Sequence, residues 1–77
     1  MHTNYKITET PNYEVAIATD GKTGYFEHLE LGDEHGGGLW FDDGALRDYD
    51  GVPYLPREVS IELEKRGVDI SYLSEEL

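Results

Sequence analysis

Tyr13-Glu14-Val15-Ala16-Ile17-Ala18, followed directly by Thr19-Asp20-Gly21-Lys22, is the most regular stretch of the sequence. The larger apolar side chains recur at every second residue, which is the period of a β-strand with one buried face. Asp20-Gly21 is a hairpin signal, because glycine supplies the positive φ that tight primed turns require. The stretch therefore predicts a strand that reverses into a second, antiparallel strand.

Further strand signals lie on both sides of this hairpin. Thr10-Pro11-Asn12 separates the hairpin from an earlier strand, and Asp42-Asp43-Gly44 is the turn of a later hairpin. The glycine-rich stretch 32–38 is expected to be a loop with few fixed contacts. The expected strands are Tyr5–Glu9, Tyr13–Ala18, Thr23 to about Leu29, Leu39–Phe41 and Ala45–Tyr49.

One helix is expected near the C-terminus. Leu55-Pro56 opens it, with proline at the first helical position, where its missing N–H is not needed. Val59 and Leu63 continue a stripe that begins at Leu55, because residues four apart share a helix face. Gly67 is expected at the C′ position, which would bring Leu63 and Val68 together in a Schellman motif.

These elements predict a single α+β domain spanning residues 1–77. Its antiparallel sheet of four or five strands is packed on one face by the C-terminal helix, and its other face is partly solvated. The tail 69–77 is either a short second helix capped by Asp69 or a frayed end.

The charge balance restricts the classes of partner. Seventeen acidic and six basic residues give a formal net charge of −11 in a chain of 77 residues. Proteins that bind nucleic acid directly need a basic footprint, and anionic membranes repel an acidic chain. Cysteine is absent, so disulfides play no part. The N-terminus lacks the basic start and apolar run of a signal peptide, so a cytoplasmic protein is expected.

Two segments resemble metal sites at first reading. Asp48-Tyr49-Asp50-Gly51 resembles the start of a calcium loop, but the sixth position is Pro53 and the twelfth is Val59 instead of glutamate. His28 and His35 stand among acids, but their spacing matches no structural zinc pattern. An Asp- and Gly-rich turn and surface histidines are the preferred interpretations, so no metal is predicted.

The remaining candidates for chemistry are a glycine run and paired aspartates. Gly36-Gly37-Gly38 lacks the lysine and the Ser/Thr of a phosphate-binding loop, and acids flank it. Its glycines are expected to allow a sharp turn or a close backbone approach to Trp40. Asp42 with Asp43, or Asp48 with Asp50, offer paired carboxylates, which occur often by chance in so acidic a chain. No enzyme activity and no cofactor are predicted.

The middle of the chain concentrates negative charge. Between Glu27 and Asp50 stand eight acids and one base, Arg47, a net of −7. In a strand, residues i and i+2 lie on one side about 6.6 Å apart, so Asp48 and Asp50 would lie close to two phosphate steps of axial rise apart. The hypothesis is an acidic face that imitates DNA, and a merely solvated acidic surface is the competing interpretation. The candidate partner-binding residues are Glu27, Glu30, Asp33, Glu34, Asp42, Asp43, Asp48 and Asp50.

A different hypothesis assigns binding to aromatic side chains. Trp40, Tyr49 and Tyr54 are candidate anchors of a small interaction module, since aromatic residues dominate the energetics of interfaces. Acidity would then serve only solubility. Because Leu39 and Phe41 flank Trp40, its side chain is expected in the core.

Several motifs carry a resemblance to known proteins. The central ones are Tyr25-Phe26-Glu27-His28, Gly36-Gly37-Gly38-Leu39-Trp40-Phe41, Asp48-Tyr49-Asp50-Gly51-Val52 and Leu55-Pro56-Arg57-Glu58-Val59, and the N-terminal ones are Ile7-Thr8-Glu9-Thr10-Pro11, Tyr13-Glu14-Val15 and Asp20-Gly21-Lys22. The central motifs resemble those of short proteins encoded by phages and prophages. The N-terminal motifs are similar to the start of a type I anti-CRISPR inhibitor.

The resemblance implies a phage-encoded inhibitor in the host bacterial cytoplasm. Anti-CRISPR proteins are small, cysteine-poor and often acidic, and several imitate DNA. The implied partner is the basic groove in which a Cascade-type surveillance complex receives DNA, and a monomer is expected. No catalytic residue carries over, because the class has no common motif.

Overall fold

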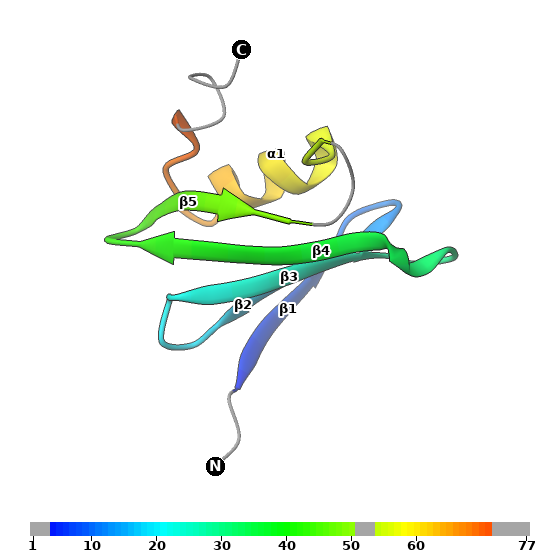
Figure 1. Cartoon of the computed structure of the whole chain (residues 1–77), viewed down its shortest axis with the longest axis horizontal. Helices are drawn as coiled ribbons and strands as arrows, with labels where there is room; N and C mark the ends of the chain where they lie inside the picture. The colour runs from blue at the N-terminus through cyan, green and yellow to red at the C-terminus, as the bar shows by residue number, and fades with distance from the viewer. Residues whose placement is uncertain (1–3, 51–53, 72–77) are drawn as a thin grey trace.

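Five antiparallel strands and one helix make up the fold, and a computed structural model describes residues 4–50 and 54–71. Neighbours in the chain are neighbours in the sheet, in the order β1-β2-β3-β4-β5 (Figure 1). The elements are β1 (Tyr5–Glu9), β2 (Tyr13–Ala18), β3 (Thr23–His28), β4 (Gly32–Asp42), β5 (Ala45–Tyr49) and α1 (Arg57–Lys65). The predicted α+β class and its C-terminal helix are confirmed.

The tight turns form where the sequence predicts them. The Asp20 side chain accepts the backbone N–H of Lys22 at 2.9 Å between β2 and β3. Asp42 pairs with Ala45, and the two residues between them, Asp43 and Gly44, have φ angles of 53° and 77°. Positive φ at both central residues is the geometry of a primed hairpin turn.

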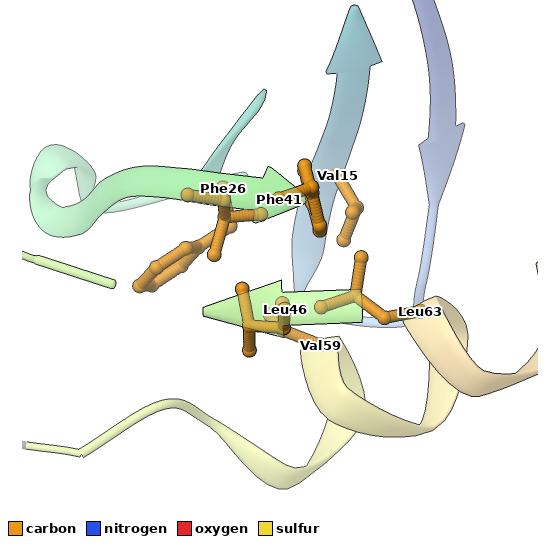
Figure 2. Close-up of a cluster of buried hydrophobic side chains, with 7 residues drawn as sticks. Val15, Phe26, Phe41, Leu46, Val59 and Leu63 are labelled. Atoms are coloured by element: carbon orange, nitrogen blue, oxygen red, sulfur yellow. The ribbon is translucent and has the colours of Figure 1, made fainter. Parts of the chain in front are cut away.

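The core lies between α1 and one face of the sheet. Val59 and Leu63 of α1 are fully buried, as their predicted stripe requires, and Leu55 packs against them from just before the helix. Figure 2 shows both helix side chains directed at the apolar side chains of the strands. The buried cluster consists of Val15, Phe26, Leu39, Phe41, Leu46, Val59 and Leu63.

The ends of α1 match the sequence closely, with one correction. Pro56 is the N-cap, with ψ 142°, and not the first helical residue, because helical geometry begins at Arg57. At the other end Gly67 has φ 87°. The N–H of Val68 donates to the Leu63 carbonyl at 3.0 Å, and the N–H of Gly67 donates to the Glu64 carbonyl at 3.0 Å. This is the predicted Schellman motif.

The prediction of a loop over residues 32–38 is wrong, because these residues belong to β4. The sheet requires glycine here. A Cβ on Gly36 would lie 2.2 Å from the Phe26 carbonyl oxygen and 2.9 Å from the Glu27 Cα. The pairing of β3 with β4 shifts register between Phe26 and His28, so two backbones approach closely at this point.

The expectation that Trp40 belongs to the core is also wrong, because 42% of its surface is exposed. Leu39 and Phe41 are the buried members of this apolar run, at 1% and 7%. Alternate residues of a strand face opposite sides, so burying these two places Trp40 on the other face. Its ring covers Gly38, where a Cβ would meet a Trp40 ring carbon at 3.0 Å.

After α1 the chain returns to the sheet. Asp69 pairs with Ala45 in a parallel bridge, and Ile70 packs against the core cluster. The Asp69 side chain accepts the Ser71 N–H at 2.9 Å. The expected choice between a second helix and a frayed tail over 69–77 falls largely outside the described residues. Within them, no helix is long and apolar enough to span a membrane.

Candidate functional site: the open face of the sheet

The face of the sheet that α1 does not cover is the most extensive candidate site, and it is called the open face here. Strand alternation assigns its members, since the core side chains fix which residues point the other way. The open face consists of Tyr5, Ile7, Glu9, Glu14, Ala16, Ala18, Thr23, Tyr25, Glu27, Gly38, Trp40, Asp42, Ala45 and Asp48. These residues include five acids and no lysine or arginine, while the exposed Arg47 lies at the register shift between β4 and β5, where strand alternation does not assign it a side.

Three of the acids stand side by side in a carboxylate row, Glu9, Glu14 and Glu27. Glu9 is the register partner of Glu14, and Glu14 is the register partner of Glu27. Directly opposite residues have Cβ atoms about 4.5–5.5 Å apart, and like charges in that position destabilise a sheet. The carboxylate row is therefore an unfavourable arrangement for folding, which makes it a candidate for function.

Tyr25 ties the carboxylate row to the rest of the open face. Its hydroxyl donates to Glu14 Oε2 at 2.9 Å. Burial raises the pKa of Tyr25 above its usual value, and the hydrogen bond to Glu14 and the charge of that carboxylate raise it further. The ring also meets Tyr5 edge-on, with centroids 5.4 Å apart. The Glu14 carboxylate is thus held in place by a neutral hydroxyl donor.

Aromatic and small apolar side chains occupy much of the remainder of the open face. Ala16 and Ala18 are 0% and 2% exposed although they lie on this face, because larger neighbours flank them. Ile7 and Tyr25 are the register partners of Ala16 on its two sides, and Tyr5 is a register partner of Ala18. The result is an apolar surface beside the carboxylate row.

The three proposed aromatic anchors have different surroundings. Trp40 is on the open face, and its register partner Asp48 places a carboxylate beside it. Tyr54 is 80% exposed but lies in the segment that precedes α1. Tyr49 packs against the core cluster and is half-buried. Trp40 is consequently the one of the three that shares a surface with acids of the sheet.

The eight predicted acids do not gather at one place. Glu34 and Asp42 are eight residues apart on β4, which at about 3.4 Å per residue separates them by about 27 Å. Glu30 and Glu34 are exposed near the start of β4, whereas Asp42 and Asp43 are exposed at its far end. The other predicted acids lie in the carboxylate row (Glu27), on the open face of β5 (Asp48) and after β5 (Asp50), and the Asp33 side chain lies outside the described part.

The sequence reasoning missed Glu9 and Glu14. Both precede the acidic middle of the chain, so a count along the sequence does not join them to Glu27. The signal that could have found them is the turn at Thr10–Asn12. The Thr10 N–H donates to the Tyr13 carbonyl at 2.7 Å, and this tight turn sets Glu9 opposite Glu14.

The candidate metal ligands serve the fold in another way. His28 Nδ1 accepts the backbone N–H groups of Glu30 and Leu31, both at 3.1 Å, and so organises the turn before β4. His28 and His35 have ring centroids 6.3 Å apart. Across residues 4–50 and 54–71, no group of three or more His, Asp or Glu side chains is arranged to hold a metal ion.

Surface hollows border this sheet, and two of them adjoin charged residues of different sign. One, of about 230 Å³, borders the carboxylate row and is lined by Glu14, Glu27 and Glu30 together with His28. The other, of about 500 Å³, lies at the C-terminal end of α1 and includes Lys6 and Arg66.

Comparison with known proteins adds no evidence on function, so the surfaces described above are the basis for assigning one. The chain matches no protein-family model, no curated protein and no solved structure.

Proposed function

We propose that this chain is a non-enzymatic inhibitor that lays its open face on a basic, nucleic-acid-binding surface of another protein. The observation that carries the proposal is the composition of that face, where strand alternation places five carboxylates, three exposed or half-buried aromatic rings and no lysine or arginine. Opposing fields speed association and select the partner, while aromatic side chains supply affinity.

The carboxylate row supports an anionic ligand role in particular. Three like charges in adjacent register positions oppose folding, and a row of lysines or arginines on a partner would relieve that repulsion. If the basic surface of the partner is a groove that otherwise holds the phosphates of DNA, the carboxylates of this chain imitate DNA. The resemblance to anti-CRISPR inhibitors supports a Cascade-type complex in the host bacterial cytoplasm as the target.

The test is a competition assay with a purified type I surveillance complex and fluorescent duplex DNA. The protein is expected to reduce DNA binding, and to do so less well as salt rises, because the Debye length falls from about 10 Å at 0.1 M to about 3 Å at 1 M. Undiminished DNA binding at saturating protein would contradict the proposed target.

Paired variants locate the surface. Glu14→Gln with Glu27→Gln is expected to weaken inhibition, whereas Glu62→Gln with Glu64→Gln removes the same charge from α1, on the other side of the sheet, and should matter much less. Equal losses from both pairs would indicate that only net charge counts.

The second candidate function is an interaction module that binds through its aromatic side chains. The 42% exposure of Trp40 on the open face favours it. Trp40→Ala would then abolish binding while both acid pairs have little effect. Salt dependence separates the candidates further, since aromatic anchoring changes little with ionic strength.

A further inference from the structure

The two edges of the sheet are unlike each other. On the outer side of β5, the Leu46 N–H donates to the Asp69 carbonyl and the Asp69 N–H donates to the Gly44 carbonyl, both at 2.9 Å. β1 pairs with β2 on its inner side, and no described element pairs with its outer side. β1 is therefore the edge at which the sheet can accept another strand.

The hydrogen-bond pattern identifies the available backbone groups. The Thr19 N–H donates to the Asn4 carbonyl at 2.9 Å, and the Thr10 N–H donates to the Tyr13 carbonyl. Bonded pairs alternate in an antiparallel ladder, so Lys6 and Thr8 face β2 with their N–H and C=O groups. The N–H and C=O groups of Tyr5, Ile7 and Glu9 consequently point outward.

The same three residues place their side chains on the open face. Tyr5 is 40% exposed and Ile7 is 55% exposed, and Glu9 is the outermost member of the carboxylate row. A strand added to β1 would continue the rows of the open face. Its residue opposite Ile7 would meet an aliphatic side chain, and its residue opposite Glu9 would meet the carboxylate row.

We propose that β1 is a docking edge for an extended basic segment of the partner protein, which pairs antiparallel to β1 as a sixth strand. The segment carries Lys or Arg opposite Glu9 and an apolar residue opposite Ile7. This inference rests on the proposed function and specifies how the partner's chain meets the open face.

Charge and size select this occupant over a second copy of the chain. Two copies would each bring a net charge of −11 to the contact. Stable dimers bury at least about 1,200 Å², and a strand of five residues offers only a small part of that area. An extended basic segment gains the charge attraction and the backbone hydrogen bonds without these costs.

The probe is a blocked peptide, Arg-Thr-Lys-Thr-Val-Glu-Tyr-Thr-Arg. In the antiparallel register its central Val is designed to lie opposite Ile7, and its Lys then lies opposite Glu9. Peptide binding is followed by amide NMR of the full chain. Chemical-shift changes and slowed hydrogen exchange are expected at Ile7 and Glu9. The matched control peptide carries an N-methyl group on Val, which removes the N–H that meets the Ile7 carbonyl. The control peptide is expected to bind at least about tenfold more weakly than the unmethylated peptide.

Two substitutions of one residue test the edge from the protein side. Ile7→Pro removes an N–H that faces solvent, and proline is tolerated at such edge positions. Ile7→Ala removes the side chain but keeps the N–H. The proline variant is expected to lose peptide binding that the alanine variant retains. Equal binding by both variants, or shift changes at Trp40 in place of β1, would overturn the proposal.

The remaining outcomes are also informative. If Ile7→Pro does not fold, the N-methyl peptide measured against the wild-type chain decides the question alone. A dimer in sedimentation that Ile7→Pro dissociates would overturn the basic segment in favour of a second copy. The DNA competition assay separates edge docking from open-face docking. If Ile7→Pro inhibits as well as the wild type while Glu14→Gln with Glu27→Gln inhibits less well, edge docking is refuted and open-face docking is not. Failure of the wild-type chain in that assay refutes the proposed function instead.

Discussion

Gly36 and Gly38 stand two residues apart in β4, and glycine is required at each for a different reason. At Gly36 the obstacle to a side chain is backbone, namely the Phe26 carbonyl at 2.2 Å. At Gly38 it is the Trp40 ring at 3.0 Å, which is on an exposed surface and can move. The same residue type in the same run therefore has unequal tolerance to substitution.

Gly36→Ala is expected to lower the free energy of unfolding by about 1–3 kcal/mol, because the added methyl group forces β3 and β4 apart. Gly38→Ala is the matched control, and it should cost clearly less while changing Trp40 fluorescence. Urea denaturation of both variants measures the difference. Similar losses from the two substitutions would contradict the close backbone approach at Gly36.

Tyr25 makes an alkaline prediction. Because its pKa is raised in the folded state, the stability it contributes is complete below its unfolded pKa near 10.0 and is lost as the pH rises through the raised value. When the phenolate absorbance of the folded protein is followed as the pH is raised, Tyr25→Phe should therefore remove the increase at the high-pH end of the curve. Tyr54→Phe, which changes an exposed ring, should leave that increase in place.

Single residues also mark the limits of sequence reasoning. The run Leu39-Trp40-Phe41 cannot bury all three side chains on one face of a strand. Apolar composition alone favours the core for Trp40, whereas the helix packs over its two neighbours and leaves the ring on the open face. Which face of the sheet α1 covers depends on tertiary packing, and this packing determines that Trp40 is exposed.

At the scale of elements, short sequence motifs correctly predicted the turns and the helix end, which are stabilised by contacts between residues close in sequence. The hairpin turns and the end of α1 depend on residues close in sequence, and both were foreseen. β4 was not, because its glycines are typical of loops and only the neighbouring backbone of β3 explains them. The carboxylate row was missed for the same reason, since it exists only across three strands.

The end of α1 gives a prediction for the helix. Gly67→Ala is expected to destabilise the protein by about 1 kcal/mol, because alanine is strained at a φ of 87°. Glu64→Ala is the control, since it changes an exposed side chain in the same turn and leaves the backbone bonds intact. Thermal unfolding should separate the two variants. A Gly67→Ala protein as stable as the control would refute the role of the Schellman motif.

The whole molecule combines a radius of gyration of 11.5 Å with a formal charge of −11. Self-repulsion at this size opposes the folded state, and dissolved salt screens it. The Tm is therefore expected to rise by a few degrees between about 10 mM and about 300 mM NaCl. A Tm that stays constant or falls over this range would argue against net repulsion.

The carboxylate row should account for part of that repulsion. Glu27→Gln is expected to raise the Tm and to reduce its dependence on salt, because Glu27 faces Glu14 directly. The same variant should bind a basic partner more weakly. Glu34→Gln, which changes an exposed side chain near the start of β4, is the control for charge alone. A Glu27→Gln protein that is no more stable than this control would show that the carboxylate row carries no folding cost.

The unequal edges of the sheet also bear on fibril formation. Growth by stacking sheets edge to edge needs two receptive sides on every molecule, one at each end of the stack. Here a molecule joined through β1 presents β5 next, where the backbone of Asp69 already occupies the position beside Leu46. An incoming chain would have to displace that segment first, so the arrangement works as a terminator that keeps an exposed strand from seeding a polymer.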